Sequence, residues 1–285
     1  MRVLLLGATG FIGSAIIPEL FEHGHSIIAL ARSDAAENQL VDKGVGVVRG
    51  DLREPEKWSN YIHEVDAVIH VAATFTDDMG DVDRQAIEAL VAQGNRSQKT
   101  TRFIYTGGVW LYGQTGDHIA TEDTPLNPIS SFSWMVENSR YALNAPCFNT
   151  SIVHPGIVYV RDGGAFSRLI PIEGRIEVWG SVEKRWPLVH RDDLAAAYRI
   201  VLEKGKPGES YNVCSEKGVR LSDITNVISE RFDLTTKPLV RSIEELISEH
   251  GEWAEGPTLD QQMSNQKMLE LGWSPEHLDA VAELL

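Results

Sequence analysis

Short apolar runs, separated by polar and glycine-containing segments, recur through the first half of the chain. The first run is Val3-Leu4-Leu5-Leu6, which ends at Gly7. A continuous apolar run of this length predicts a strand that is buried on both faces of a parallel sheet. Comparable runs predict further strands at residues 26–30, 45–49, 67–74, 102–106 and 151–159.

Apolar residues at helical spacing occupy the segments between these strands. In residues 83–93, for example, Ile87, Leu90 and Val91 share one face of a helix. The other predicted helices follow Gly13 or cover residues 133–143, 192–202, 222–232 (with Ser222 as its N-cap) and 265–271. Strands that alternate with helices predict an α/β protein with a parallel sheet.

The turn between the first strand and the first helix is rich in glycine and reads Gly7-Ala8-Thr9-Gly10-Phe11-Ile12-Gly13. Glycine permits a tight turn with positive φ and a close approach of backbone to a pyrophosphate, and the following helix N-terminus attracts the anion. Because a strand precedes and a helix follows, the run predicts a Rossmann-type, doubly wound dinucleotide site. We expect this domain to cover residues 1–150, with strand 151–159 and helix 192–202 returning to it. Residues 160–285 then form mainly a smaller substrate-binding lobe.

Three more positions refine the predicted cofactor. Where an NAD site places Asp or Glu after the second strand, the chain has Ala31, and the next residue is Arg32. A guanidinium pairs with a 2′-phosphate that a carboxylate would repel, so the sequence favours NADP over NAD unless Arg32 is simply solvated. Asp51-Leu52 could reach the adenine amino group, and the small residues Ala72-Ala73-Thr74 let a cofactor lie against the backbone. His70, inside a buried strand, is expected to be a core residue.

These features together resemble the extended short-chain dehydrogenase/reductase superfamily, in its NAD-dependent epimerase/dehydratase-like branch. The matching segments follow the family order: residues 7–13, 51–52, 68–73, 154–159 (His154-Pro155-Gly156-Ile157-Val158-Tyr159), 187–195, 211–213 and 271–275. The resemblance implies that NAD(P) binds and that substrate lies beyond the carboxyl ends of the strands, beside the second lobe. It also implies cofactor contacts from Thr106, Asn138, Pro155, Gly156 and Val158.

The chain departs from that family at all three catalytic positions. Family members place a Ser after the fifth strand, and a Tyr and a Lys four residues apart on the next helix. The matching positions here hold Gly108, Trp134 and Asn138. None of these side chains titrates near neutral pH, so the usual proton donor is missing and the chain resembles an atypical branch that lacks it. The titratable substitutes are Tyr112, His154 and His190, each of which is more commonly structural.

Several aromatic residues belong to segments that the resemblance places near substrate: Trp110, Trp134, Tyr159, Trp179 and Trp186. They would suit an apolar or planar ligand, although core packing is the more common role of such residues.

The charge and the cysteine content of the chain limit the kinds of partner that we expect it to bind. With 41 acidic and 26 basic side chains, the net charge of −15 argues against direct nucleic-acid binding. Cys147 and Cys214 supply neither a disulfide framework nor a metal site. No signal peptide or membrane-spanning segment is visible, so we expect a cytoplasmic protein. The expected partner is a small-molecule substrate or ligand. A homodimer formed through helices 83–93 and 133–143 is a further possibility.

The sequence leaves three functions open. The favoured one is an NADP-dependent oxidoreductase or epimerase-like enzyme that acts on a small organic molecule. The second is a catalytically silent NADP(H)-binding redox sensor, and the third is a non-redox isomerase, lyase or cyclase.

Overall fold

The computed structural model describes residues 1–97 and 99–285. Its internal contacts divide the chain into two compact units. Unit 1 comprises Met1–Gly107, Trp134–Val153 and Ala195–Ser210. Unit 2 comprises Gly108–Ser133, His154–Leu194 and Tyr211–Leu285.

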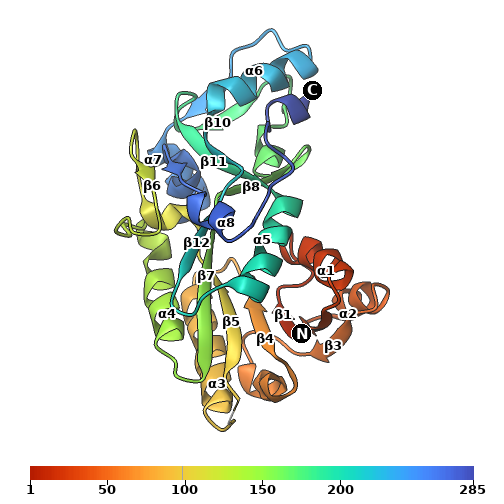
Figure 1. Ribbon diagram of the computed structural model, residues 1–285. Coiled ribbons are helices and arrows are strands. Elements are labelled where there is room, and N and C mark those ends of the chain that lie inside the picture. Colours follow the sequence, from red (N-terminus) through yellow and green to blue (C-terminus); the bar gives the residue numbers. More distant parts are fainter. Residues whose placement is uncertain (98) are drawn as a thin grey trace. The chain divides into compact units, whose positions relative to one another are not determined.

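The main sheet has seven strands in the order β12-β7-β5-β4-β1-β2-β3 (Figure 1). Their bounds are β1 (Arg2–Leu6), β2 (Ser26–Ala31), β3 (Gly46–Arg49), β4 (Ala67–His70), β5 (Thr101–Thr106), β7 (Phe148–Pro155) and β12 (Ser210–Val213). All pairs from β3 to β7 are parallel. The strand order reverses between β1 and β4, which is the Rossmann switch point where ligands bind. The predicted doubly wound α/β fold is confirmed.

Amphipathic helices cover this sheet: α1 (Gly13–Glu22), α2 (Asp34–Val41), α3 (Met79–Gly94), α4 (Ser133–Leu143) and α5 (Arg191–Lys204). The apolar stripe Ala86, Ile87 and Leu90 of α3 packs with Val68 of β4 and Phe103 of β5, all fully buried. Two short 3-10 helices, Pro55–Lys57 and Ser59–Glu64, precede β4. The helical spacing of apolar residues thus supplies the side chains that bury both the helix face and the sheet.

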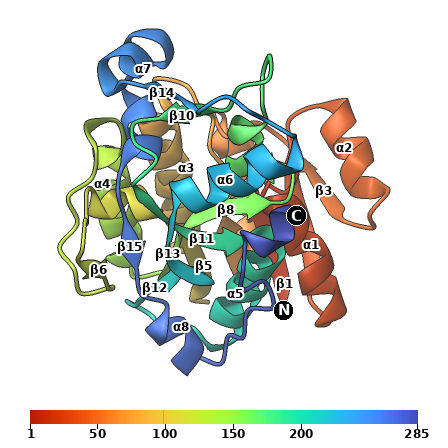
Figure 2. The same cartoon turned by 90° about the horizontal axis from the view of Figure 1, so that it is seen from above.

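Unit 2 contains a four-stranded sheet in the order β13-β11-β8-β9, with β8 (Ile157–Val160), β9 (Gly163–Gly164), β11 (Arg185–His190) and β13 (Glu216–Arg220). Helix α6 (Leu221–Arg231) lies beside β11 in Figure 2, and its Leu221, Ile224 and Ile228 belong to the same core cluster as the buried Leu188 of β11. Two small sheets pair β10 (Glu177–Trp179) with β14 (Leu239–Arg241), and β15 (Gln262–Met263) with β6 (Ile119–Ala120). The remaining elements are α7 (Ile243–His250), α8 (Gln266–Glu270) and 3-10 helices at Val109–Tyr112, Ser130–Phe132, Ala165–Leu169, Glu252–Thr258 and Ala282–Leu284.

The single strand predicted over residues 151–159 is wrong. The structure has two strands there, β7 in the main sheet and β8 in the four-stranded sheet. They are separated at Gly156, where an added Cβ would lie 2.5 Å from the carbonyl oxygen of Pro187. The change of sheet depends on this close approach of Pro187, which the run itself does not reveal.

Three predicted boundaries also need correction. The fourth strand ends at His70 rather than residue 74, and α3 begins at Met79 rather than Asp83. Ser222 does not cap α6: the N-cap is Arg220, and the Ser222 amide donates to the Val182 carbonyl. Helix boundaries depend on such tertiary hydrogen bonds, which a local pattern does not reveal.

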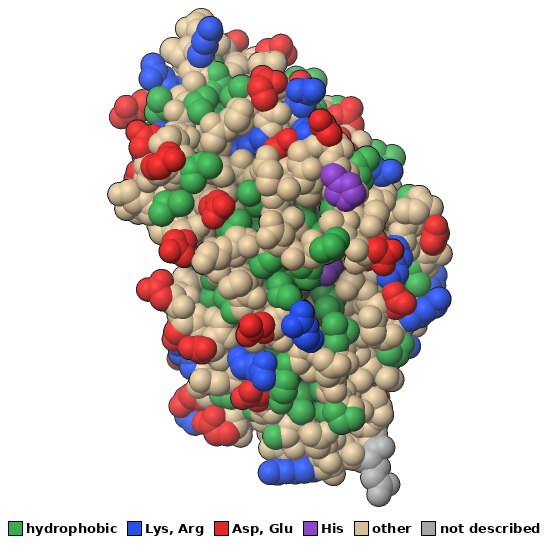
Figure 3. Space-filling view, turned by 90° about the vertical axis from the view of Figure 1, so that its left-hand side faces the viewer, with side chains coloured by type: hydrophobic (Ala, Val, Ile, Leu, Met, Phe, Trp, Pro, Cys, Tyr) green, Lys and Arg blue, Asp and Glu red, His purple; other side chains and the backbone are tan. Residues whose placement is uncertain are grey.

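The surface carries mixed charge, with acidic and basic side chains interspersed among hydrophobic ones on the face drawn in Figure 3. Within the described part of the chain, no helix combines the length and apolar character needed to cross a membrane.

Candidate cofactor and active site

The glycine turn after β1 is packed so tightly that two of its glycines are required. Gly7 has a φ of +90°, and a Cβ there would lie 2.8 Å from the backbone of Ala72. A Cβ on Gly13 would lie 2.1 Å from the carbonyl oxygen of Gly7. The amide of Gly10 donates to that same oxygen over 3.0 Å, which closes the turn. The cradle predicted from the sequence therefore forms against the segment that follows β4.

The helix that follows this turn has no side chain capping its N-terminus. Ile12 is the N-cap of α1, and it makes no side-chain cap hydrogen bond. Helix α2 differs, because the hydroxyl of its N-cap Ser33 accepts a hydrogen bond from the Ala36 amide. A helix N-terminus without a side-chain cap can accept an anionic ligand in its place. Thr9, Gly10 and Phe11, at the tip of the turn, are exposed.

Arg32 and Asp51 lie near each other beyond the ends of β2 and β3. The Arg32 side chain is 75% exposed, and its Nε lies 3.9 Å from an Asp51 carboxylate oxygen, so the ion pair is weak. Asp51 also accepts a hydrogen bond from the Arg53 amide, and its carbonyl accepts one from the indole of Trp58. The neighbouring Leu52 packs against the core of unit 1. The turn that carries Asp51 is thus rigid, while the guanidinium of Arg32 reaches into solvent.

The ends of β4 and β5 carry the next predicted contacts. Ala72, Ala73 and Thr74 follow β4 as an irregular segment, in which the Thr74 hydroxyl accepts from Thr76. The Thr106 hydroxyl, at the end of β5, donates to the His70 carbonyl over 2.7 Å and meets the Tyr198 hydroxyl over 2.7 Å. Thr106 therefore ties β4, β5 and α5 together.

Asn138, which the sequence resemblance matches to the family's lysine, belongs to a buried polar network centred on Asp83. Its amide nitrogen donates to Asp83 over 2.8 Å and to the Gly80 carbonyl over 3.0 Å. Asp83 also accepts from the Tyr105 hydroxyl over 2.8 Å. His70 Nε2 lies 3.0 Å from the other carboxylate oxygen, although the ring does not meet hydrogen-bond geometry. Both amide hydrogens of Asn138 are thus used inside unit 1.

The sequence pattern alone assigned no role to Asp83, which marked only the start of a predicted helix. A charged residue among Val82, Ala86 and Ile87 was the available signal, since a buried carboxylate needs partners. Burial chiefly, with the Asp83 carboxylate in addition, raises the pKa of Tyr105 well above its usual value.

Trp134, at the family's tyrosine position, packs against the first turn of α3. A Cβ on Gly80 would lie 2.7 Å from the Trp134 ring, so the glycine makes room for the indole. The indole is half-buried. It fills space between α4 and α3 in addition to any ligand contact.

Gly108, at the family's serine position, is extended and open. Its φ is 173°, and a Cβ there would have no heavy atom within 4 Å. Its amide donates to Nδ1 of His154 over 3.3 Å, and the His154 ring contacts the Tyr112 ring edge-on with centroids 5.7 Å apart. Two of the three substitute acids therefore lie beside the vacant serine position, within unit 2.

Neither of these two groups is an obvious proton donor at neutral pH. Burial lowers the pKa of His154 to about 4, so its imidazole is neutral. Burial likewise raises the pKa of Tyr112 above its usual range, and its hydroxyl donates to Asn212 over 2.7 Å. Tyr112 keeps its proton and could still act as a hydrogen-bond donor.

The third substitute acid, His190, lies at the end of β11 away from this group. It stacks on His277 with ring centroids 3.6 Å apart, and burial first and His277 second lower its pKa. Glu283 lies 2.9 Å from His277 Nδ1, and the three side chains have ligand atoms close together. Stacked imidazoles direct their in-plane lone pairs side by side rather than at one point, so the arrangement is a poor metal site.

Pro155, Gly156 and Val158 span the junction of β7 and β8. Gly156 donates to the Val213 carbonyl over 2.8 Å, and Val158 pairs with Val189 of β11. Pro155 is the last residue of β7, Val158 belongs to β8, and Gly156 lies between the two strands. The backbone at Gly156 is closely packed.

The predicted pocket aromatics differ in their surroundings. Tyr159 and Trp186 are buried in the core of unit 2. Trp110 is half-buried, contacts Phe132 with centroids 5.4 Å apart, and has an indole nitrogen that is buried without a hydrogen-bond partner in the described part of the chain. Trp179 is also half-buried and belongs to a separate aromatic cluster. Trp110 and Trp179 are the better candidates for ligand contact.

Comparison with known proteins gives one family match and several relatives. The model of the "NAD dependent epimerase/dehydratase family" matches residues 3–214. An uncharacterized protein of Saccharomyces cerevisiae, YLL056C, is 30% identical over 100% of this chain and 98% of its own length.

Solved structures resemble the chain over its whole length. The human epimerase family protein SDR39U1 with NADPH superposes with a TM-score of 0.79 at 20% identity, covering 100% of this chain and 98% of that one. UDP-glucose 4-epimerase of Thermotoga maritima with UDP-glucose gives a TM-score of 0.79 at 19% identity, covering 100% and 97%. At these identities the structures establish the fold alone.

Proposed function

Because the chain belongs to the NAD-dependent epimerase/dehydratase family, we propose that it binds NADP(H) and acts as an oxidoreductase or epimerase-like enzyme. Its substrate is a small organic molecule, and it works without the family's Tyr–Lys proton donor. The observation that carries the proposal is the glycine cradle, in which Gly7 and Gly13 leave no room for a Cβ. The N-terminus of α1, which no side chain caps, supports it.

The residues fit the cofactor as follows. The turn at residues 9–13 and the start of α1 would hold the pyrophosphate, and Asp51-Leu52 would border the adenine. In unit 1, Ala72-Ala73-Thr74 and Thr106 would border the nicotinamide side. The cofactor contacts of Pro155, Gly156 and Val158, which belong to unit 2, stay a prediction from the family resemblance. Asn138 has only its amide oxygen left for a ribose hydroxyl, because both amide hydrogens are used. When bound, the cofactor supplies or accepts a hydride.

The preference for NADP over NAD rests on Arg32. Its guanidinium is exposed and only weakly paired, so it is available to a 2′-phosphate. Arg49 is a contrasting neighbour, because it is engaged by Asp34 over 2.8 Å and by Glu37 over 3.0 Å. The human protein SDR39U1, which was solved with NADPH, agrees with this preference, whereas a UDP-glucose 4-epimerase of Thermus thermophilus was solved with NAD.

Protonation is the step for which the chain lacks the usual group. A positioned acid or base contributes about 10²- to 10⁴-fold to rate. With glycine, tryptophan and asparagine at the three catalytic positions, the proton would come from water, from the substrate or from a substitute such as Tyr112. Water or the substrate is the favoured source, because Tyr112 donates its hydroxyl proton to Asn212 and His154 is neutral, with its Nδ1 accepting from the Gly108 amide.

A second candidate function is a catalytically silent NADP(H)-binding sensor. The observation that favours it is the concerted replacement of the three catalytic side chains. The burial of both amide hydrogens of Asn138 in the Asp83 network adds to this case, because it gives the lysine position a structural role.

Two measurements test the proposal. Titration with NADPH and NADH should give tighter binding of NADPH, and Arg32→Ala should reduce this advantage while the control Arg49→Ala should not. The protein is then incubated with NADPH and a panel of aldehydes, ketones and enones. We expect at least one of these compounds to oxidise NADPH, and the absorbance of NADPH reports the reaction. Binding without oxidation of NADPH by any compound would favour the sensor, and absence of binding of either cofactor would refute both functions.

A further inference from the structure

An arginine in unit 2 lies over two tryptophan rings. The guanidinium carbon of Arg168 is 4.8 Å from the ring centre of Trp253 and 5.1 Å from that of Trp179. The two indoles are 5.6 Å apart, and His250 stacks on Trp179 with centroids 4.7 Å apart. Both distances from Arg168 are within the range of cation–π attraction, so the aromatic rings hold the guanidinium in place.

Arg168 has no carboxylate partner among residues 1–97 and 99–285. Arg168 is an exposed residue, but contact with the rings removes part of the water around its guanidinium and lowers the pKa of Arg168, and no carboxylate opposes that shift. The acidic residues nearby are engaged elsewhere, since Arg241 pairs with Glu177 over 3.3 Å and with Glu249 over 2.8 Å. Glu177 also accepts from the Trp179 indole over 2.7 Å. The charge of Arg168 is therefore uncompensated within the described chain.

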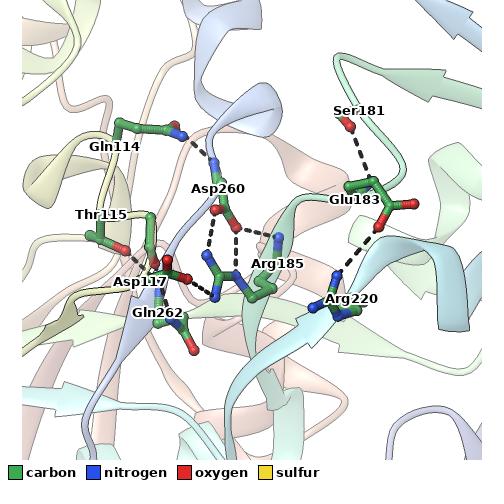
Figure 4. A network of polar contacts seen from close by, with 10 residues as sticks. Gln114, Thr115, Asp117, Ser181, Glu183, Arg185, Arg220, Asp260 and Gln262 are labelled. Atoms are coloured by element: carbon green, nitrogen blue, oxygen red, sulfur yellow. Dashed lines mark hydrogen bonds and ion pairs between the residues drawn. The ribbon is translucent and has the colours of Figure 1, made fainter.

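Two other arginines of the same unit, Arg185 and Arg220, each have a carboxylate partner. Figure 4 shows Arg185 held by Asp260 and Asp117, with N–O distances of 2.6 and 2.9 Å, and Arg220 paired with Glu183 over 3.3 Å. In a chain with 41 acidic and 26 basic side chains, carboxylates are abundant. Arg168, which lies on aromatic rings and has no carboxylate partner among the described residues, therefore differs from Arg185 and Arg220.

The side chain of Lys184 fixes the two segments that carry Trp179 and Trp253. Lys184 is 3% exposed, and its ammonium donates to the carbonyl of Pro257 over 2.7 Å and to the carbonyl of Trp179. It thereby links β10, which carries Trp179, to the 3-10 helix that carries Trp253. Lys184 has no carboxylate partner among the described residues either. A buried ammonium without a counter-charge is costly, and an anion bound nearby would offset part of that cost.

We propose that Arg168, Trp179 and Trp253 form a binding site for the carboxylate or phosphate group of a small organic ligand. The planar guanidinium offers paired N–H donors that match either anion, and the indoles offer apolar surface to the rest of the ligand. This assignment rests on the proposed function only in identifying that ligand as the substrate. Anion binding itself requires no cofactor, and it narrows the substrate to an acid or a phosphate ester.

Fluorescence tests the site, because two of its members are tryptophans. The full chain is titrated with benzoate, phenyl phosphate, inorganic phosphate and the neutral benzamide, and tryptophan fluorescence and thermal unfolding are followed. We expect saturable binding of benzoate or phenyl phosphate, and binding of benzamide at least about tenfold weaker, since one hydrogen bond to a charged group is lost. Saturation by inorganic phosphate as well would identify the anion as sufficient for binding.

Matched variants assign the response to Arg168. Arg168→Gln should weaken benzoate binding by about tenfold or more, Arg168→Lys should recover part of it, and the control Arg220→Gln should leave it unchanged. All three variants should still bind NADPH. Loss of benzoate binding with NADPH binding retained therefore concerns the anion site, whereas loss of NADPH binding in the wild type concerns the proposed function. Equal responses to benzoate and benzamide, or no saturable response in the wild type, would overturn the proposal even if Arg168→Gln fails to fold.

Discussion

The buried carboxylate of Asp83 should be among the most sensitive positions in unit 1. It is 8% exposed and accepts hydrogen bonds of 2.8 Å from both Tyr105 and Asn138, which are 1% and 4% exposed. Asp83→Ala leaves the phenol and the amide hydrogen without an acceptor in the protein interior. Each unsatisfied group costs about 1–3 kcal/mol.

The net loss is smaller than the sum of these terms, because the variant no longer buries a carboxylate. We expect the free energy of unfolding to fall by about 3 kcal/mol, which corresponds to a fall in Tm of about 6–12 °C for a chain of this size. Urea denaturation followed by circular dichroism gives the first quantity, and a thermal scan gives the second.

Two companion variants make the test specific. Asp81→Ala removes an exposed carboxylate from the first turn of α3, two residues before Asp83, and should cost less than about 1 kcal/mol, its interaction with the helix dipole. Asp83→Asn should fall between the two, because its amide oxygen can accept from both Tyr105 and Asn138, as Oδ2 of Asp83 does, while its nitrogen replaces the Oδ1 that faces His70 Nε2. If Asp83→Ala costs no more than Asp81→Ala, the network does not stabilise the fold as argued.

The remaining predictions concern the cradle and the buried lysine. Gly13→Ala places a Cβ 2.1 Å from the Gly7 carbonyl oxygen, so it should abolish measurable NADPH binding in a titration, whereas Gly108→Ala, in open space, should leave the fold intact. Burial lowers the pKa of Lys184 from 10.5 to about 7, so between these values the unfolded chain binds the extra proton and stability rises with pH. Relative to Lys184→Met, the wild type should therefore gain about 2 kcal/mol in unfolding free energy from pH 7 to pH 9 in urea titrations, and a parallel pH dependence of the two proteins would contradict this assignment.

The sheet and the cradle could be predicted from the sequence because both depend on local signals. Apolar runs that end at Gly7 or Thr106 specify strands buried on both faces, and each was found within one or two residues. Gly13 is required by a backbone contact within the turn, and Gly7 has a φ of +90°, so the motif contains this part of the geometry, whereas the contact of Gly7 with Ala72 is distant in the sequence. The division of residues 151–159 into two strands could not be predicted, because it depends on the approach of Pro187, which is distant in the sequence.

The interior polar groups could not be assigned for the same reason. Asp83, Tyr105 and Asn138 lie on α3, β5 and α4, and nothing in their sequence spacing brings them together. Lys184 and Arg168 also look like ordinary basic residues of loops and strands in the sequence. Only the packing shows that one is buried against backbone carbonyls and the other lies on two indoles.

The three residues that the sequence resemblance matches to the family's catalytic positions are not equivalent in the folded chain. Gly108 is a vacancy, because a side chain there meets nothing within 4 Å. Trp134 and Asn138 are instead integrated into the packing between α4 and α3, through Gly80 and Asp83. We therefore expect Gly108→Ser to be tolerated alone, while Trp134→Tyr with Asn138→Lys should lower stability by removing the indole and the amide bridge.

That double variant should nevertheless retain NADPH affinity if it folds, since the pyrophosphate cradle lies on other elements. Differential scanning fluorimetry with and without NADPH separates the two effects, because a ligand that still binds raises Tm by the same increment in a destabilised protein. A double variant as stable as the wild type would show that the α3–α4 contacts do not constrain these positions. The proton donor would then have been lost without any structural role replacing it.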